Sequence, residues 1–387
     1  MFALRSGKIY TVTNGIMEKG TVLVEGAHIL AVGEQVPIPE GICDYDVTGR
    51  VITPGWIDCH THLGIAVEGT GSYGNDKNEV DMSLGPHLRA LDGINPEDAG
   101  LRDARCGGIT AVIVTPGSEN VIGGLSVAIK TAGQVVDDMV LRQPAGLKVA
   151  FGENPKLKAM QRQSGSPSTR MGIAALLREQ FVKGQNYLLR REKHRQDPQG
   201  AFERDLALEA LAGVLTGEYP LRAHAHAAED IMTAIRIAEE FKIPLVLEHA
   251  TEGDKVADEI AKRRIPCSIG PTLTARVKVE LENRRYATAT VLQRAGVKIA
   301  LVTDHPILPV NALRMEVVMA ISHGLTEEAA LRAVTLDAAD IMGVSGRIGS
   351  IEKGKDADLV IWSGSPFDIY SRIEKVFISG RLVYAAD

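Results

Sequence analysis

Cysteines are scarce in this chain of 387 residues, and long apolar runs are lacking. The four cysteines, at positions 43, 59, 106 and 267, have no CxxC or paired spacing. This argues against a disulfide framework and favours reduced thiols in a cytoplasmic protein. No segment reaches the roughly 18 apolar residues that cross a bilayer, so we expect no membrane partner.

Excess positive charge is also lacking. The formal net charge is −6, which argues against nucleic acid or an anionic membrane as a partner. The first residues, MFALRSGKIYTV, alternate like a strand and lack the apolar core and cleavage site of a signal peptide. With 45% hydrophobic and 24% charged residues, the chain has an ordinary soluble composition.

Short alternating strands occur at both ends of the chain. KIYTVTN, GTVLVEGAHILAVG and CDYDVTGRVI lie near the N-terminus, and ADLVIWS and KVFISGRLVY lie near the C-terminus. Polar turns separate them, a pattern typical of a small β-sandwich rather than of helix-linked strands. We therefore predict one small β-sandwich domain built from residues 1–53 plus 347–387.

Residues 54–346 have a different pattern, in which short apolar strands alternate with helical stretches. The strands that the sequence indicates are WIDCH, ITAVIVT, LKVAFG, LRAHAH, PLVLEH, PCSIG and VKIALVTD. This repetition predicts a parallel sheet closed into a (β/α)8 TIM-like barrel. The remaining strand is expected in or near VVDDMVLRQ.

Two long segments interrupt the alternation. Residues 65–95 are rich in glycine and charge, and residues 157–200 contain SGSPST and the charged run RREKHRQDPQ. Long loops after barrel strands are common positions for active-site lids, so both segments are expected to lie over the functional end of the barrel. The charged run by itself indicates a solvated helix face.

Histidines and one aspartate stand at the predicted ends of four strands. They are His60 and His62 after WIDC, His224 and His226 in LRAHAH, His249 in PLVLEH, and Asp304 in VKIALVTD. Alternate residues of a strand share a face, and the carboxyl ends of the strands of such a barrel converge on one pocket. Imidazoles with a carboxylate suit Zn²⁺ or a similar first-row ion. The sequence therefore predicts a divalent metal site at the barrel mouth.

The motifs HTH, EHAT and TDHP, with the closing GSIEKGKDADLVIW, resemble those of the metal-dependent amidohydrolase superfamily. Within it, the chain is most similar to the group that contains the imidazolonepropionases and the prolidase-like metallopeptidases. The stretch AHAHAAEDI resembles a motif of prolidase-like members whose first histidine is a ligand. The resemblance implies that His226 lies on the substrate side. The implied ligands are His60, His62, His224, His249 and Asp304.

A second ion would need a bridging anion, for which the chain offers two candidates. Lys148 in GLKVAFG is similar in place to the lysine that CO₂ carboxylates in relatives with two ions, and its strand parity points it inward. Glu153 in GENP resembles the Glu-x-Pro ligand of the N-acetylglucosamine-phosphate deacetylases, but it has outward parity. A site with one ion and neither bridge, as in imidazolonepropionases, stays open.

These residues predict a hydrolase. A metal lowers the pKa of bound water towards about 7, and Asp304 is expected to take the proton of the water and pass it to the leaving nitrogen. The metal or His226 would polarise the carbonyl oxygen. The expected substrate is a cyclic amide or a dipeptide-like molecule with an amide-type C–N bond. The alternatives are an aminohydrolase (deaminase), an N-acyl deacetylase and a non-catalytic scaffold of this fold.

The sequence determines the substrate contacts and the identity of the metal ion less closely than the metal ligands. Arg170 in SPSTRMG is a candidate for a bidentate pair with a substrate carboxylate, although an exposed arginine fits the same pattern. Asn120 in TPGSENVIGG is a second candidate contact, in a segment whose glycines equally suit a plain turn. The donor set accepts one or two ions, with Zn²⁺ the first candidate and Mn²⁺, Fe²⁺ or Co²⁺ as alternatives. We expect a homo-oligomer, the commonest state of soluble enzymes.

Overall fold

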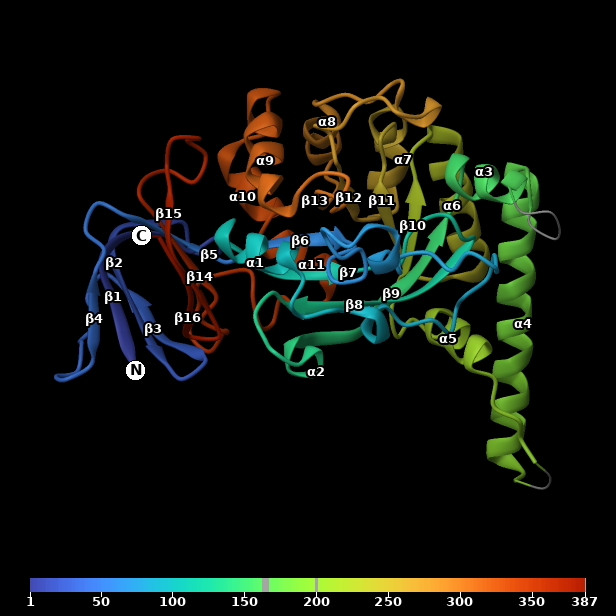
Figure 1. Ribbon diagram of the computed structural model, residues 1–387, viewed down its shortest axis with the longest axis horizontal. Helices are drawn as coiled ribbons and strands as arrows, with labels where there is room; N and C mark the ends of the chain where they lie inside the picture. The colour runs from blue at the N-terminus through green and yellow to red at the C-terminus, as the bar shows by residue number, and fades with distance from the viewer. Residues whose placement is uncertain (162–166, 199–200, 387) are drawn as a thin grey trace.

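Eight strands form a TIM-like barrel in the middle of the molecule (Figure 1). This computed structural model describes residues 1–161, 167–198 and 201–386. Strands β6 and β13 close the barrel, because the Asp304 N–H donates to the His60 carbonyl and the His62 N–H donates to the His305 carbonyl. The strands, in spatial order, are β6 (Trp56–Thr61), β7 (Ile109–Val114), β8 (Ile122–Lys130), β9 (Val140–Ala150), β10 (Leu221–Ala225), β11 (Leu245–His249), β12 (Cys267–Ile269) and β13 (Ile299–Leu301).

Strand β8 departs from the predicted all-parallel sheet. It pairs antiparallel with both β7 and β9, whereas the other barrel pairs are parallel. The expected position of the eighth strand was wrong, since VVDDMVLRQ holds α2 (Val136–Met139) and the start of β9. The sequence did not indicate β8 because glycines break the apolar run at its start. Gly124 has φ +130°, and a Cβ there would lie 2.5 Å from the Leu88 carbonyl oxygen.

Helices cover the outside of the barrel, and several begin at a side chain that caps the first turn. Asp98, Thr169, Asp205 and Thr326 each accept a hydrogen bond from a backbone N–H two or three residues later. The helices besides α2 are α1 (Ala99–Cys106), α3 (Glu153–Gln161), α4 (Arg170–Gln196), α5 (Leu206–Leu215), α6 (Ala228–Phe241), α7 (Ala257–Lys262), α8 (Thr288–Arg294), α9 (Leu313–Ser322), α10 (Glu327–Ala333) and α11 (Leu336–Met342).

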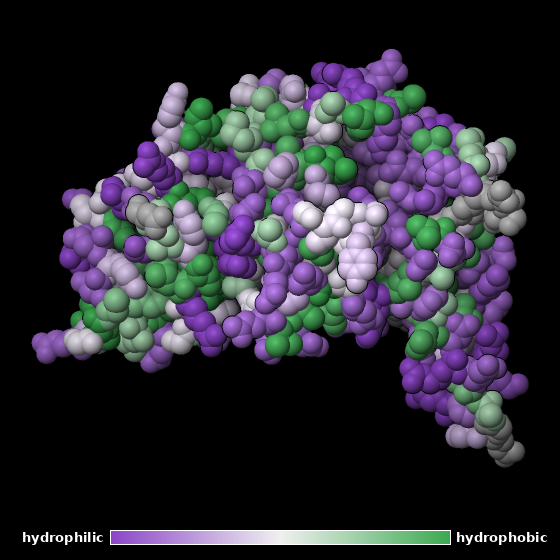
Figure 2. Space-filling model, in the orientation of Figure 1, coloured by the Kyte–Doolittle hydropathy of each residue, from purple (hydrophilic) through white to green (hydrophobic). Residues whose placement is uncertain are grey.

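Helix α4 occupies most of the segment predicted as a long loop at residues 157–200. It runs along one side of the molecule and extends beyond the barrel (Figure 1). The charged run lies at this projecting end, where the surface is mostly hydrophilic (Figure 2). The predicted solvated helix face is therefore confirmed for residues 190–196, while residues 164–166 of SGSPST and residue 199 lie outside the described residues. No helix in the described part of the chain is long and apolar enough to cross a bilayer.

The long segment at residues 65–95 is folded against β8. It contains the short 3₁₀ helices η1 (Gly71–Gly74) and η2 (Ala90–Gly93). Two isolated bridges, Leu84 with Ile122 and Arg89 with Leu125, join it to β8 in parallel. This segment therefore adds a partial strand beside the barrel at its predicted functional end.

Both ends of the chain contribute to a second sheet, where Figure 1 places both termini. Its strands are β1 (Phe2–Tyr10), β2 (Ile16–Glu25), β3 (His28–Gly33), β4 (Cys43–Asp46), β5 (Val51–Pro54), β14 (Leu359–Trp362), β15 (Ile373–Ile378) and β16 (Arg381–Ala385). Their order is β16-β15-β14-β5-β1-β2-β3, with β4 paired to β1. That this sheet is a separate β-sandwich domain with the bounds given above stays a prediction.

Lys130 at the end of β8 joins the barrel to the second sheet. Its ammonium lies 2.7 Å from the Asp356 carboxylate and 2.9 Å from the Asp358 carboxylate, and it donates to Ser379 Oγ at 2.7 Å. All three charged side chains are at most 8% exposed. Because a buried charge needs partners to offset its lost hydration, this cluster fixes one sheet on the other.

Candidate metal centre and active site

The strands that close the barrel bring His60, His62 and Asp304 together at its mouth. Asp304 Oδ1 lies 3.4 Å from His60 Nε2 and 3.2 Å from His62 Nε2. A bulge in β6 assists this arrangement, since Asp58 is paired with Val112 but Thr61 with Val114. The extra residue turns the end of the strand. One nitrogen or oxygen atom from each of the three side chains can therefore reach a shared ion.

Three further histidines form a second group beside the first. The ring of His249 lies 4.6 Å from that of His224, 4.8 Å from that of His226 and 4.7 Å from that of His60, measured between centroids. The ligating atoms of His224, His226 and His249 lie within 4.8 Å of one another. Geometry thus places His226 with the ligand candidates, although the sequence assigned it to the substrate side.

Backbone carbonyls orient two of the imidazoles. His62 Nδ1 lies 2.6 Å from the Thr115 carbonyl oxygen, and His249 Nδ1 lies 2.7 Å from the Gly270 carbonyl oxygen. A carbonyl only accepts, so each Nδ1 carries the hydrogen and each Nε2 keeps a free lone pair. This second hydrogen bond is typical of histidines that bind a metal through the other nitrogen.

A buried ion pair orients His60 in the same way. Glu248 Oε2 lies 2.8 Å from His60 Nδ1, and Glu248 Oε1 lies 2.7 Å from Arg222 Nη2. Both partners of this pair are fully buried. The sequence analysis did not single out either residue, although a glutamate and an arginine within the apolar strands LVLEH and LRAHAH were visible signals.

Electrostatics favour neutral imidazoles at His224, His226 and His249, whereas the carboxylates of Glu248 and Asp304 raise the pKa of His60 against the effect of burial. Burial is the main cause that lowers the pKa of His249 to about 3, and it holds the pKa values of His224 and His226 well below their usual range. Burial raises the pKa of Asp304, but the neighbouring imidazoles of His249, His60 and His62 outweigh it and lower that pKa strongly. Neutral imidazole and ionised carboxylate are the forms that bind metals.

The two candidate bridges lie in different places. Lys148 is buried, with its Nζ 3.4 Å from His60 Nε2 and 3.2 Å from the Pro116 carbonyl oxygen that accepts its hydrogen bond. Burial lowers the pKa of Lys148 to about 8. Glu153 instead begins α3, where its carboxylate accepts from the Glu280 N–H at 3.3 Å. Lys148 therefore touches the cluster, whereas the Glu153 carboxylate is engaged by the loop outside it.

The residues at the mouth fit one or two divalent first-row ions. Two buried nitrogens, His224 Nδ1 and His226 Nε2, have no hydrogen-bond partner among the described residues, as expected of atoms that await a ligand. His249 and Asp304 have φ values of +69° and +52°, in a left-handed region that costs of order 1–3 kcal/mol for such residues. Strain of this kind at two ligand candidates agrees with a functional site.

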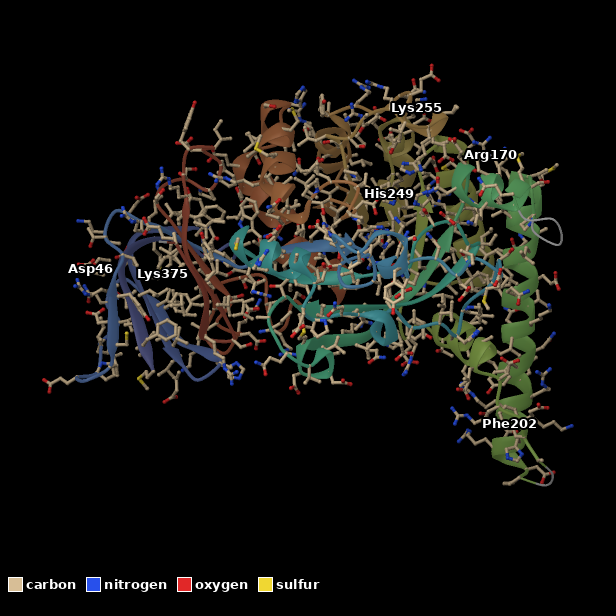
Figure 3. All side chains as sticks on the ribbon, in the orientation of Figure 1. Asp46, Arg170, Phe202, His249, Lys255 and Lys375 are labelled. Atoms are coloured by element: carbon tan, nitrogen blue, oxygen red, sulfur yellow. The ribbon has the colours of Figure 1, made fainter. Side chains whose placement is uncertain are left out.

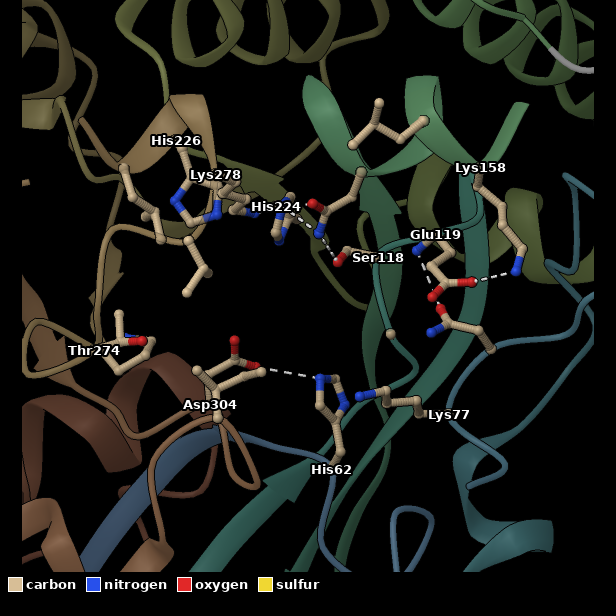
Figure 4. Close-up of a pocket in the computed structure, with 18 of the residues that line it drawn as sticks. His62, Lys77, Ser118, Glu119, Lys158, His224, His226, Thr274, Lys278 and Asp304 are labelled. Atoms are coloured by element: carbon tan, nitrogen blue, oxygen red, sulfur yellow. Dashed lines mark hydrogen bonds and ion pairs between the residues drawn. The ribbon is translucent and has the colours of Figure 1, made fainter. Parts of the chain in front are cut away.

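A cavity of about 340 Å³ opens beside the cluster. Figure 4 shows His62 and Asp304 on one side of it, with His224, His226 and Lys278 on the other. The sequence analysis did not assign Lys278 or Asn154, while Ser118 lies in TPGSENVIGG, the segment that supplied the candidate polar contact Asn120. The polar residues of the cavity wall are His62, Lys77, Asn78, Ser118, Glu119, Asn154, Lys158, Gln161, His224, His226, Thr274, Lys278 and Asp304.

Two predicted substrate contacts have other partners. Arg170, the first residue of α4, donates from Nε to both carboxylate oxygens of Asp230 at 3.0 Å, and it lies well apart from His249 (Figure 3). Asn120 donates from its amide to the carbonyl oxygens of Glu79 and Met82 at 3.0 and 2.8 Å. Neither side chain lines the cavity, so their substrate roles stay predictions without geometric support.

Comparison with known proteins agrees with the motifs. The amidohydrolase family model matches residues 51–383. The crystal structure of an amidohydrolase from Thermotoga maritima MSB8 is 41% identical over the whole of both chains, with a TM-score of 0.97. An imidazolonepropionase from Sphingopyxis alaskensis is 26% identical over 93% of this chain and 90% of its own length.

Other relatives extend the same likeness. Amidohydrolase tasK from Hapsidospora irregularis is 29% identical over 93% of this chain, which spans only 39% of the length of tasK. A prolidase crystal structure at 19% identity shares the fold, with a TM-score of 0.64. The predicted resemblance is confirmed: the chain belongs to the amidohydrolase family, is similar to the imidazolonepropionases, shares the fold of prolidase structures, and is a hydrolase of C–N bonds.

Proposed function

We propose that the protein hydrolyses an amide-type C–N bond of a small cyclic amide or dipeptide-like molecule, with one or two divalent ions as cofactor. The observation that carries this proposal is the juxtaposition of two groups of metal-ligating side chains. His60, His62 and Asp304 form one, and His224, His226 and His249 form the other. Both groups border the same cavity through His62, Asp304, His224 and His226.

Asp304 is the proposed general base and acid. A bound Zn²⁺ or similar ion, when present, would supply a water of lowered pKa as nucleophile. The strongly lowered pKa of Asp304 keeps its carboxylate ionised at neutral pH, the form that can coordinate an ion and accept a proton. The same group then passes the proton to the leaving nitrogen, so the amine departs neutral.

His226 is the proposed electrophilic contact. Its Nδ1 lies 2.7 Å from Thr251 Oγ1, which fixes the ring, while its buried Nε2 has no partner in the described part of the chain. If Nε2 carries the hydrogen, it donates to the carbonyl oxygen of the substrate and stabilises the developing negative charge. If it does not, His226 is a third imidazole ligand of its group.

We also infer that Lys148 rather than Glu153 would bridge two ions. The unprotonated amine of Lys148 adds to CO₂, forms an N–C bond and releases one proton, which gives an anionic carbamate. A pKa of about 8 leaves about a tenth of the amine neutral at pH 7, enough for this reaction to proceed. Infrared detection of ¹³C-labelled carbamate in wild-type protein, absent from Lys148→Met, would test it.

A substrate panel tests the proposed reaction. Purified protein loaded with Zn²⁺, Mn²⁺ or Co²⁺ is incubated with cyclic imides, N-acyl amino acids, Xaa-Pro dipeptides and aminated heterocycles. Formation of a new carboxylate and amine supports the proposal, whereas ammonia from the heterocycles alone would indicate a deaminase. Release of acetate alone would indicate a deacetylase. No turnover and no bound metal by elemental analysis would leave only the scaffold alternative.

A further inference from the structure

A charged side chain lies on the buried face of α9, outside the proposed chemistry. The buried positions of this helix are Leu313, Glu316, Val317 and Ala320, at the spacing of one helical stripe, and Glu316 alone among them is charged. Glu316 is only 1% exposed. A buried carboxylate needs hydrogen-bond donors that offset its lost hydration, so its place on this face depends on specific partners.

The loop that follows β12 supplies these donors. Glu316 Oε1 accepts from the Thr272 N–H at 2.8 Å and from the Leu273 N–H at 2.9 Å, and Glu316 Oε2 accepts from Thr272 Oγ1. Neither N–H group has a backbone acceptor in the described part of the chain. The carboxylate therefore takes the place of a backbone partner and fixes the path of the loop, whose next residue, Thr274, lies in the cavity wall (Figure 4).

The same loop begins with the carbonyl group that orients His249. The Gly270 carbonyl accepts from His249 Nδ1 at 2.7 Å. A Cβ at Gly270 would lie 2.2 Å from the Val302 carbonyl oxygen, so this end of the loop is closely packed. Only Pro271 separates the peptide unit of the Gly270 carbonyl from that of the Thr272 N–H, and its ring fixes φ. A shift of Thr272 is therefore transmitted to the Gly270 carbonyl.

His62 provides a comparison within the same centre. Its Nδ1 donates to the Thr115 carbonyl oxygen at 2.6 Å, and Thr115 directly follows β7. The Thr115 N–H donates to the Thr61 carbonyl oxygen at the end of β6, so a bond between two barrel strands holds this acceptor. Loss of the Glu316 carboxylate should consequently disturb His249 and leave His62 in place.

We propose that Glu316 is a positioning residue of the metal centre. By holding Thr272 and Leu273, its carboxylate keeps the Gly270 carbonyl on His249 Nδ1, which leaves His249 Nε2 free to bind an ion. The hydrogen bond that an imidazole makes determines which of its nitrogens carries the hydrogen, so loss of this acceptor removes the selection. The inference rests on the proposed function, because that proposal assigns His249 to the metal.

NMR of metal-free protein with ¹⁵N-labelled histidine tests the orientation. His62→Asn and His249→Asn assign the two Nδ1–H signals, which we expect in wild-type protein because both protons are buried and hydrogen-bonded. In Glu316→Met, which nearly keeps the side-chain volume but lacks an oxygen acceptor, the His249 signal should be lost while the His62 signal remains. Glu316→Gln keeps one oxygen for the two N–H groups and should retain the His249 signal.

Zn²⁺ affinity, measured by competition with a chelator, provides the second readout. The Kd should rise about 10–100-fold in Glu316→Met, as is typical when a group that orients a metal ligand is lost. Glu280→Met is the matched control, because it also removes a buried carboxylate that accepts a backbone N–H, in this case that of Glu153. It should keep both NMR signals and the wild-type Kd.

Retention of the His249 signal in folded Glu316→Met overturns the proposal, as does an unchanged Zn²⁺ Kd, the joint loss of both signals, or the absence of a His249 signal from wild-type protein. If Glu316→Met does not fold, Glu316→Asp carries the test with the same expected results, because its shorter side chain withdraws the carboxylate from the loop. Failure of the proposed function is distinct, since wild-type protein would then bind no Zn²⁺ while NMR still reports the orientation of His249.

Discussion

At the scale of single residues, the centre depends on groups whose partners set their chemical state. Carbonyl oxygens hold His62 and His249 with Nε2 free, and a carboxylate does the same for His60. These contacts remove the choice between ring tautomers before any ligand arrives. The ligands are thus organised by bonds that lie outside the cavity.

Replacing Asp304 by asparagine tests its proposed role. Asparagine keeps the shape of the side chain but cannot accept a proton, so kcat should fall by about 10²–10⁴-fold. Steady-state kinetics on protein of equal metal content measures this. Asp92→Asn, an exposed position that pairs with Arg89, should keep wild-type kcat. Full turnover by a folded, metal-containing Asp304→Asn protein would contradict the assignment.

Acid should destabilise the metal-free protein. The pKa values of His224, His226 and His249 are lowered by burial, so the folded chain holds them neutral while the unfolded chain protonates them below about pH 6.5. Their contribution to stability is present above that pH and is lost as pH falls through it. The free energy of unfolding in urea and chelator, measured between pH 7.5 and 5, should therefore decrease.

A variant separates this effect from general acid unfolding. His249→Asn removes one titrating group, so its slope of unfolding free energy against pH should be shallower by up to about 1.4 kcal/mol per pH unit. His323→Asn, at an exposed histidine outside the cluster, is the comparison variant. Equal slopes for wild type and His249→Asn would show that the buried histidines do not govern the acid response.

Sequence alone identified the side chains at the mouth but not their neighbours. The ligand candidates stand out because histidine at the end of an apolar strand has a distinct chemistry and a familiar spacing. Lys278 does not, since it lies in a loop whose path no local pattern specifies, and neither does Asn154, an ordinary polar residue in the first turn of α3. Arg170 was a reasonable carboxylate contact by its chemistry, but the nearby Asp230 holds its guanidinium.

At the scale of elements, the predicted strands were right where apolar residues run together and wrong where glycine breaks the run. β6, β7 and β9 to β13 each overlap one predicted segment. Only the start of β8 was considered, as a possible turn, because Gly123 and Gly124 follow Ile122, although close packing against Leu88 requires glycine at position 124. The direction of a strand also has no local signal, which is why its antiparallel course was not predicted.

The Lys130 cluster provides a test at this scale. Lys130→Met would leave the buried Asp358 without a cation, while Asp356 keeps its pair with Arg347, and should lower the free energy of unfolding by about 3–5 kcal/mol. Lys298→Met removes a half-exposed ion pair with Asp340 and should cost less than about 1 kcal/mol. Urea denaturation of both variants measures the difference. Similar losses would show that the cluster does not hold the second sheet on the barrel.

At the scale of the whole molecule, bound metal should connect activity with stability. An ion that binds only the folded chain at 100 times its Kd stabilises it by about 2.7 kcal/mol. Chelation should therefore abolish turnover and lower Tm, and Zn²⁺, Mn²⁺ or Co²⁺ should restore both. Ca²⁺ should restore neither, because the imidazole-rich donor set does not suit a hard cation. Unchanged Tm and activity after verified metal removal would contradict a metal-dependent hydrolase.

The homo-oligomeric state expected from the sequence stays a prediction.

The reversed course of β8 has a consequence for how molecules enter and leave. The short connection from β7 to β8 stays at the mouth, where Asn120 and the N–H groups of Gly117 and Glu119 bond to residues 77–82. Tied to neighbours along its length, this border has little freedom to swing aside. A ligand that enters therefore meets a fixed border on this side of the mouth, while residues 270–278 contribute Pro271, Thr274, Val277 and Lys278 to the cavity wall.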